Sequence, residues 1–320
     1  MADTLGSILT EAIAVLSAAG RDEPRRRARR FVAAFLDVPP TELLSHAERA
    51  LEPAVVERLR RSLARIVIGE PLSRVLGWRE FWGLRFALSA DTLDPRPESE
   101  TLVEAVLRRI PDRNVPLSFL DLGTGSGCLL LALLSELPTA VGIGVDVAVG
   151  AVMTARENAA VLSLADRSRF FVGDWSSALS GCFTVIVVNP PYIGGVEFAG
   201  LPPEVRRYDP RRAVDGGEEG LAAYRRIAAD LPALLSSSGI FAVEIGAGQA
   251  TVVAAILQAE GLLIDGIERD LAGIERCIVA RPTKAIRPRG PRRDKKILEC
   301  GFVPSSVGGG EFDTAQGSAG

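Results

Sequence analysis

The sequence predicts an α/β protein in which a small helical domain precedes a doubly wound, mostly parallel sheet. From residue 117 onward, short apolar runs alternate with helical segments, and such βαβ alternation implies a parallel sheet covered by helices on both faces. Seven apolar runs follow this pattern, so we expect a seven-stranded sheet. Before residue 76, apolar residues recur at helical spacing with little sign of strands.

Residues 1–75 form the predicted helical domain. Leu5 begins one amphipathic pattern, Pro24 stands near the first turn of a second helix, and residues 53–72 suggest a third. The arginine run at 25–30 lies beside acidic residues, so we expect a solvated helix face there. The only histidine, His46, is expected to be structural or exposed.

Residues 76–116 are expected to form a hairpin and a linker helix. The stretch EFWGLRFAL, centred on Gly83, has the pattern of a hairpin, and a helical pattern runs from Glu98 to Ile110. The sheet domain then occupies residues 117–282. The periodicity stops after that, so the basic and then glycine- and serine-rich tail, residues 283–320, is predicted to be disordered.

Composition and charge restrict the classes of function. The chain has 320 residues and a net charge of −3, but residues 86–280 carry 25 acidic and 15 basic side chains. Such a region repels a phosphate backbone, so charge does not favour a nucleic-acid substrate. The four cysteines lack the spacing of a metal site or a disulfide framework. The N-terminus lacks the basic region of a signal peptide, and no apolar run reaches the ~18 residues of a membrane span. We therefore expect a cytoplasmic protein without a metal.

The ends of the first two strands of the predicted sheet carry candidate ligand-binding residues, because ligands bind outside the carboxyl ends of strands in such sheets. The first strand ends in Asp121 and a loop with glycines at 123, 125 and 127, which lets the backbone turn sharply and a ligand approach closely. Its G-x-G-x-G spacing departs from the dinucleotide fingerprint. Asp146 ends the second strand, where its carboxylate can accept from ribose hydroxyls or cap the next helix.

The third strand of the sheet ends in Asp174 and Trp175. The Asp174 carboxylate can accept a hydrogen bond from an adenine amino group, and Trp175 offers an aromatic face beside it. The alternative is an ordinary turn aspartate next to a packed tryptophan. Together, the first three strand ends predict an adenosine-binding site.

The fourth strand ends in Asn189, Pro190, Pro191 and Tyr192. A buried strand cannot continue through two prolines, and their fixed φ makes the turn rigid. This rigidity would aim the Asn189 side chain and the Pro190 carbonyl into the same space, where two acceptor oxygens suit a planar –NH2 group. Tyr192 could stack on that group. An electrophile delivered from the adenosine site would then react without a metal, a nucleophilic cysteine or a basic histidine.

These motifs resemble the class I S-adenosylmethionine-dependent methyltransferases, which have a Rossmann-like fold, and within them the release-factor glutamine N5-methyltransferases (HemK/PrmC). The resemblance covers residues 1–282. It rests on DLGTGSG, GDW and NPPYI, on the helical domain, and on GEPLSRVLGWREFWGLRF, DPRPESETLVE, PPEVRRYDPRRAVDGGEEGLAAYRRI and EIGAGQ. The PRPE segment and the EVRRYDP…DGGEEGL stretch make the match specific, because NPPY is shared with adenine and guanine methyltransferases.

The resemblance implies methyl transfer from S-adenosylmethionine, with S-adenosylhomocysteine as product, to the side-chain amide nitrogen of the glutamine in the G-G-Q motif of peptide-chain release factors. This modification belongs to translation termination. The implied cofactor-binding residues are Asp121, Gly123, Thr124, Gly125, Ser126, Gly127, Asp146, Asp174, Trp175 and Asn189. The implied catalytic residues are Asn189, Pro190 and Tyr192, and the implied substrate-binding residues are Asn189, Pro190, Pro191, Tyr192, Arg96 and Glu98, of which the last two would border the substrate entrance. The helical domain would recognise the substrate, and we expect a monomer.

Three departures from the family pattern and two alternative functions accompany this expectation, and one departure is that the tail after residue 282 lies outside the pattern. VAVGAVMTA follows Asp146 where the family often has a small polar residue and proline, and LDPRPE makes one commonly apolar position acidic at Asp94. One alternative is a DNA or RNA amino methyltransferase acting on adenine N6 or guanine N2, which are also planar amines. The other is a binding module without catalytic activity.

Overall fold

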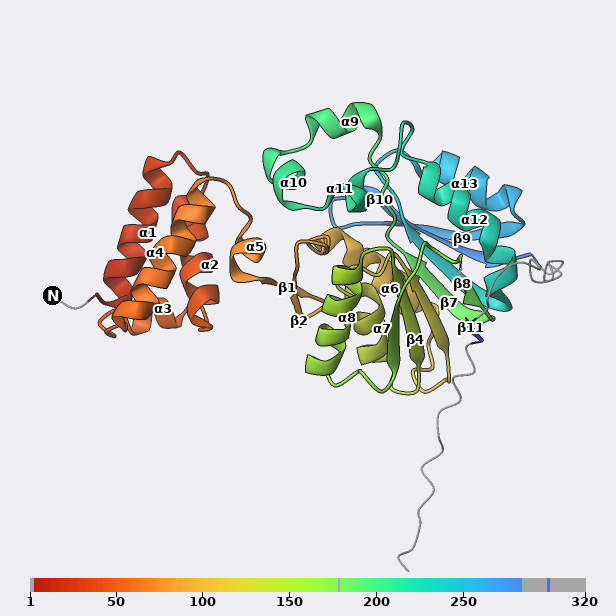
Figure 1. Cartoon of the computed structure of the whole chain (residues 1–320), viewed down its shortest axis with the longest axis horizontal. Helices are drawn as coiled ribbons and strands as arrows, with labels where there is room; N and C mark the ends of the chain where they lie inside the picture. Colours follow the sequence, from red (N-terminus) through yellow and green to blue (C-terminus); the bar gives the residue numbers. More distant parts are fainter. Residues whose placement is uncertain (1–2, 178, 284–297, 300–320) are drawn as a thin grey trace, which may run out of the picture.

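The helical domain comes first in the computed structural model, which describes residues 3–177, 179–283 and 298–299. Its helices are α1 (Leu5–Ala18), α2 (Pro24–Leu36), α3 (Glu42–Ser45), α4 (Pro53–Val67) and α5 (Leu72–Leu76). Pro24 is the first residue of α2, as predicted. The helices enclose their own apolar core, which is separate from the two cores of the sheet domain. Figure 1 shows this domain beside the sheet domain.

A hairpin and a short linker connect the two domains. Strands β1 (Trp78–Phe81) and β2 (Leu84–Ala87) pair antiparallel, which confirms the predicted hairpin. The two turn residues, Trp82 and Gly83, have φ values of +54° and +68°, a conformation that matches the twist of a two-residue hairpin. The linker continues through a 3-10 turn and α6, whose bounds are Pro97–Ser99 and Glu100–Arg108.

The predicted seven-stranded sheet is present in the order β5-β4-β3-β7-β8-β10-β9. Strands β5, β4, β3, β7 and β8 run parallel, and β10 runs antiparallel to both β8 and β9. The bounds are β3 Ser118–Leu122, β4 Val141–Asp146, β5 Ser168–Val172, β7 Phe183–Val188, β8 Leu235–Glu244, β9 Leu262–Arg269 and β10 Glu275–Pro282. Each of the seven predicted apolar runs therefore supplies one strand, and the fold class is confirmed.

Helices cover both faces of the sheet, as the sequence pattern predicts. Helices α6, α7 (Cys128–Glu136) and α8 (Val149–Val161) pack against one face, and α12 (Ala222–Leu234) and α13 (Ala250–Ala259) pack against the other. The parallel strands are buried between these layers. Because they run in the same direction, their carboxyl ends lie along one edge of the sheet.

A segment of three short helices follows the fourth strand of the sheet. We call α9 (Gly195–Gly200), α10 (Pro203–Tyr208) and α11 (Arg211–Val214) the cap segment. The cap segment returns to the strand ends, because the amide of Ile193 donates to the carbonyl of Val214 (3.0 Å). Figure 1 shows it beside the carboxyl ends of the strands, between the hairpin and α12.

The described part of the tail is short. The Thr283 amide donates to the Gly261 carbonyl (3.0 Å), and β11 (Leu298–Glu299) pairs in parallel with β6 (Leu179–Ser180). The prediction of disorder otherwise falls on 284–297 and 300–320, which lie outside the described residues. Of the helices that are described, none has the length and apolar character needed to cross a membrane.

Candidate active site

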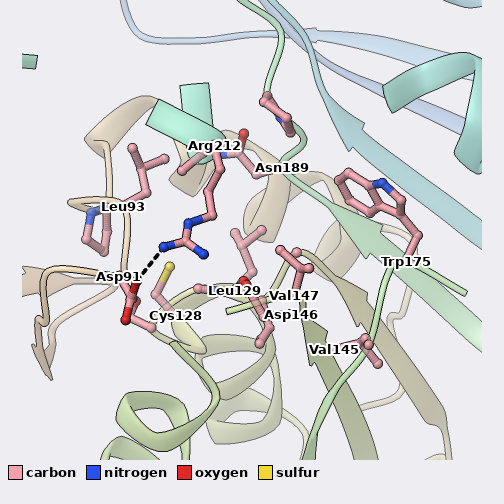
Figure 2. A pocket seen from close by; sticks show the side chains of 18 of the residues that line it. Asp91, Leu93, Cys128, Leu129, Val145, Asp146, Val147, Trp175, Asn189 and Arg212 are labelled. Atoms are coloured by element: carbon pink, nitrogen blue, oxygen red, sulfur yellow. Dashed lines mark hydrogen bonds and ion pairs between the residues drawn. The ribbon is translucent and has the colours of Figure 1, made fainter. Parts of the chain in front are cut away.

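A cavity of about 250 Å³ lies at the carboxyl ends of β3, β4, β5 and β7. It brings together nine of the predicted site residues, namely Gly123, Thr124, Gly125, Ser126, Asp146, Asp174, Trp175, Asn189 and Pro191. The predicted residues Asp121, Gly127, Pro190, Tyr192, Arg96 and Glu98 do not line it. The linker before α6 and the cap segment complete the wall with residues that were not predicted to line a site, including Asp91, Ser99 and Arg212. Figure 2 shows this cavity.

The glycine loop after β3 needs its glycines for two different reasons. A Cβ on Gly123 would lie only 3.3 Å from the Trp175 ring, so glycine allows the indole to pack on the loop. A Cβ on Gly125 would meet no atom within 4 Å, so this part of the loop faces open space in the cavity wall. Both residues have positive φ, which favours glycine.

Asp121 of β3 stabilises this loop by a side-chain hydrogen bond. Its Oδ2 accepts a hydrogen bond from the Thr124 hydroxyl (2.7 Å), while its buried Oδ1 has no partner within the described chain. Burial raises the pKa of Asp121 to about 7, although the Thr124 hydroxyl opposes this shift. The hydroxyl of Ser126, which lines the cavity, is also buried without a partner among the residues described. Unsatisfied polar atoms next to an open glycine loop are suited to a polar ligand.

Asp146 accepts hydrogen bonds from two backbone amides at the end of β4, and its ribose role stays a prediction. Its Oδ1 accepts from the Ala148 amide (2.9 Å) just before α8, and its Oδ2 accepts from the Gly125 amide (2.9 Å). Burial raises the pKa of Asp146, and these two amides lower it. A carboxylate offers about four acceptor positions, so each oxygen retains one for a ribose hydroxyl.

The residues after β5 are held by neighbours on both sides. Asp174 forms a 2.6 Å ion pair with Arg226 of α12, and both side chains are about half exposed. Trp175 has a φ of +52°, which is unusual for a residue with a Cβ, and its ring packs against Gly123. Asp174 therefore keeps only part of its acceptor capacity for an adenine amino group, and that role stays a prediction.

The Asn189 corner, residues 189–192, joins the cavity to a network behind it. The Asn189 Nδ2 donates to the Ser99 hydroxyl (3.2 Å), and its Oδ1 has no hydrogen-bond partner among the described residues. Pro190 is buried, and no described donor hydrogen bonds to its carbonyl. Tyr192 donates its hydroxyl proton to Glu244 Oε1 (3.3 Å), and burial raises the pKa of that phenol. Asn189 Oδ1 and the Pro190 carbonyl are therefore both free to accept, and their joint orientation toward a substrate amide stays a prediction.

Two stretches of the family resemblance, EIGAGQ and DGGEEGL, support the backbone of this corner. Gln249, in EIGAGQ, donates its Nε2 to the Tyr192 carbonyl (3.0 Å) and accepts at Oε1 from the Gly246 amide (3.0 Å). Gly216 and Gly220, in DGGEEGL, lie so close to Tyr192 that a Cβ on either would collide with its backbone. These contacts explain why glycine and glutamine are needed at those positions.

Arg96 of the PRPE segment is engaged by a buried carboxylate. Asp209, at the end of α10, pairs with Arg96 of the linker and with Arg74 of α5 (2.8 Å). We call Arg74, Arg96 and Asp209 the latch, because they join the helical domain, the linker and the cap segment. Glu98 is exposed. A role for Arg96 or Glu98 at the substrate entrance stays a prediction.

The unusual Asp94 is buried next to the latch. Its Oδ2 accepts from the Ser73 hydroxyl (2.6 Å) and lies 3.4 Å from an Arg79 nitrogen. A buried carboxylate is costly unless it is paired; these two partners satisfy Oδ2, whereas the buried Oδ1 has no hydrogen-bond partner among the described residues. The departure therefore changes packing beside α5 and not the cavity wall, since Asp94 does not line it.

A second ion pair crosses the cavity. Arg212 of the cap segment lies 2.6 Å from Asp91 of the linker, and both residues line the cavity. Figure 2 shows the Arg212 side chain reaching across to Asp91. Neither residue was predicted, because no local pattern distinguishes this arginine and this aspartate from the other exposed charges of the chain.

Two family models match consecutive parts of the chain. Residues 7–77 match the PrmC N-terminal domain, and residues 81–200 match the methyltransferase small domain. The first match covers most of the helical domain, and the second runs from the end of β1 through β2, the linker and the first four strands of the sheet to the Asn189 corner.

Curated relatives match almost the whole chain. A release factor glutamine methyltransferase of Rhodospirillum rubrum is 46% identical over 96% of this chain and 91% of its own length. A protein of the same name from Bradyrhizobium diazoefficiens is 43% identical over 83% of this chain and 91% of its own length. Among solved structures, the hMettl16 catalytic domain in complex with MAT2A 3'UTR hairpin 6 shares the fold, with a TM-score of 0.51, 14% identity, and coverage of 74% of this chain and 84% of that chain.

Proposed function

The chain belongs to the release factor glutamine methyltransferase family, and we propose that it transfers a methyl group from S-adenosylmethionine to the side-chain amide nitrogen, N5, of the glutamine in the G-G-Q motif of peptide-chain release factors. The observation that carries this proposal is the Asn189 corner. Its Asn189 side chain lines a cavity built from four strand ends, and neither Asn189 Oδ1 nor the Pro190 carbonyl accepts a hydrogen bond from a described donor.

The cavity wall fits the proposed methyl donor. S-adenosylmethionine, when bound, supplies an electrophilic methyl group on a positively charged sulfur. The open glycine loop around Gly125 and the unpartnered Ser126 hydroxyl would receive its polar end. The remaining acceptor positions of Asp146 would hold the ribose, and Asp174 and Trp175 would hold the adenine.

The Asn189 corner would orient the substrate amide. An amide nitrogen is a weak nucleophile because its lone pair is delocalised into the carbonyl group. When Asn189 Oδ1 and the Pro190 carbonyl accept both of its hydrogens, the developing positive charge on the nitrogen is stabilised and the nitrogen is aimed at the cavity. The proline turn fixes these acceptors before the substrate arrives, so little reorganisation is needed during the reaction.

The wider assignments follow from the same proposal. The helical domain, residues 1–75, would recognise the release factor, and Arg96 and Glu98 would stand near the glutamine entrance. We propose that the protein is cytoplasmic, since its proposed partner is a component of translation. We also propose that it acts as a monomer.

The proposal is tested by offering competing substrates to the purified protein. With labelled S-adenosylmethionine, we expect incorporation of label into a release factor and none into adenine-containing DNA or ribosomal RNA. Incorporation into nucleic acid without incorporation into the release factor would instead establish the amino methyltransferase alternative.

A further inference from the structure

The ion pair between Arg212 and Asp91 bridges the cap segment and the linker at the mouth of the cavity. Both residues line the cavity, and their side chains are 54% and 38% exposed. Val147 and Asp174, which are also exposed, lie on the same cavity wall, so the cavity meets solvent here. Figure 2 shows the pair spanning the space between the two segments. A ligand that enters or leaves the cavity therefore passes this pair.

The carboxylate of Asp91 occupies a place that only a glycine leaves open. A Cβ on Gly150, in the first turn of α8, would lie 2.2 Å from Asp91 Oδ2 and 3.0 Å from its Cγ. The other oxygen, Oδ1, accepts from Arg212 Nη2 at 2.6 Å. Gly150 belongs to VAVGAVMTA, the stretch that departs from the family pattern. This glycine therefore gives Asp91 the room from which it pairs with Arg212.

The turn that carries Asp91 is held by the helical domain. Arg74 of α5 donates to the carbonyl of Ser89 (2.7 Å) and to the carbonyl of Thr92 (2.6 Å). Within the turn, the Ser89 amide donates to the Thr92 hydroxyl (3.0 Å). Asp91 lies between these two residues, so its backbone is fixed.

The backbone that carries Arg212 is fixed on both sides. Asp209, which precedes it, belongs to the latch, and the buried Val214, which follows it, accepts from the Ile193 amide (3.0 Å). The Arg212 side chain itself is more than half exposed. Exposed side chains change rotamer within picoseconds to nanoseconds, so this side chain can leave Asp91 while the backbone stays in place.

We propose that Arg212 and Asp91 form a gate at the mouth of the cavity, which the Arg212 side chain opens by swinging into solvent and closes by pairing with Asp91. This inference rests on the proposed function, which assigns the cavity to S-adenosylmethionine, and adds a role in exchange of that donor. The closed pair slows both entry and exit.

The exposure of the pair sets the size of the effect. An ion pair in contact with water is weak, so the gate opens easily and the open state is well populated. When a ligand enters only the open state, its observed association rate is reduced by the fraction of molecules that are open. For a pair of this strength, the closed state slows exchange by about 2- to 5-fold.

The test measures kon and koff of S-adenosylmethionine by surface plasmon resonance on the immobilised full-length protein. Arg212→Ala removes the gate, so kon and koff should rise together by about 2- to 5-fold, with a smaller change in Kd. Gly150→Ala should have the same effect, because the added Cβ displaces the Asp91 carboxylate, whereas alanine itself favours the helix. The double variant should exchange donor no faster than either single variant, because both changes break the same pair.

Two matched variants serve as controls. Arg211→Ala breaks the neighbouring pair with Asp215, neither of which lines the cavity, and Gly200→Ala adds a Cβ that meets no described atom within 4 Å. Both should keep the wild-type rates. If Arg212→Ala and Gly150→Ala also keep these rates, or if koff rises without kon, the gate is overturned and the donor site stands. If the wild type binds no donor, the proposed function fails and the gate fails with it.

Discussion

Two buried carboxylates, Asp209 and Glu244, have opposite surroundings. In the latch, the Asp209 side chain is 4% exposed and is paired with the arginines Arg74 and Arg96. Behind the Asn189 corner, Glu244 is 2% exposed, and its one side-chain hydrogen bond among the described residues comes from the Tyr192 hydroxyl.

The difference shows how burial serves structure in one place and chemistry in the other. A carboxylate with two cationic partners stays ionised and joins the segments that carry them, which here are α5, the linker and the cap segment. A carboxylate with only hydroxyl partners can gain or lose its proton near neutral pH, and each state orders the neighbouring hydrogen bonds differently. The following predictions test this contrast, from the largest expected effect to the smallest.

Removing the latch carboxylate should have the largest effect. Asp209→Ala leaves Arg74, whose side chain is 8% exposed, without its carboxylate partner. Loss of one partner of a buried pair costs about 3–5 kcal/mol, and we expect a decrease of that size in the free energy of unfolding measured with urea. Glu11→Ala breaks the exposed pair with Arg60 and should cost less than about 1 kcal/mol. Equal losses in the two variants would contradict a structural role for the latch.

Removing the acceptor at the corner should affect turnover instead of stability. Asn189→Ala should lower kcat by about 10²-fold or more, because one preorganised polar group is lost, while donor affinity changes less. Rapid-mix assays and calorimetry measure the two quantities separately. Asn114→Ala, in an exposed turn, serves as the control. Near-normal turnover in the Asn189 variant would refute the two-acceptor mechanism.

The two carboxyls whose pKa values burial raises to about 7 should make stability depend on pH. Because the folded pKa values of Asp121 and Glu244 are about 7 and exceed their unfolded values, their contribution is present at low pH and is lost as pH rises through 7. We expect the free energy of unfolding to decrease by about 1.4 kcal/mol per carboxyl between pH 6 and pH 8. Asp121→Asn and Glu244→Gln should each remove one share of this decrease in urea titrations. An unchanged slope in either variant would assign the pH dependence elsewhere.

The ion pair across the cavity should contribute least to stability. Arg212 and Asp91 are 54% and 38% exposed, so water screens their attraction, in contrast with the latch. Arg212→Ala should lower the free energy of unfolding by less than about 1 kcal/mol, similar to Arg211→Ala, which breaks the neighbouring pair with Asp215. Thermal unfolding of both variants provides the comparison. A loss as large as that of Asp209→Ala would remove the distinction between buried and exposed pairs.

Local patterns explain how much of this structure could be predicted from the sequence. The seven strands and the hairpin at Gly83 follow from alternation and turn residues that are close together in the chain. The positions of Gly125, Asp146 and Asn189 around one cavity follow from the rule that ligands bind at the carboxyl ends of parallel strands. Both kinds of inference need only the residues of one element and its end.

Pairings across long sequence separations could not be predicted. Ser99 and Asn189 are separated by 90 positions, and Arg96 and Asp209 by 113. Only the folded chain brings such residues together, so a serine before a helix and an aspartate after one carried no signal of their role. Glu244 ends a predicted strand, and its position in EIGAGQ was the one feature that could have indicated a site residue.

The central claim is that the Asn189 corner orients a planar amide nitrogen for methylation, and the product identifies that atom. The wild-type protein would be incubated with S-adenosylmethionine and a release factor, and fragment masses would locate the methyl group. We predict one methyl group on the side-chain amide of the G-G-Q glutamine, and none when this glutamine is replaced by glutamate. A methyl group on another residue, or unchanged labelling of the glutamate variant, would contradict the account.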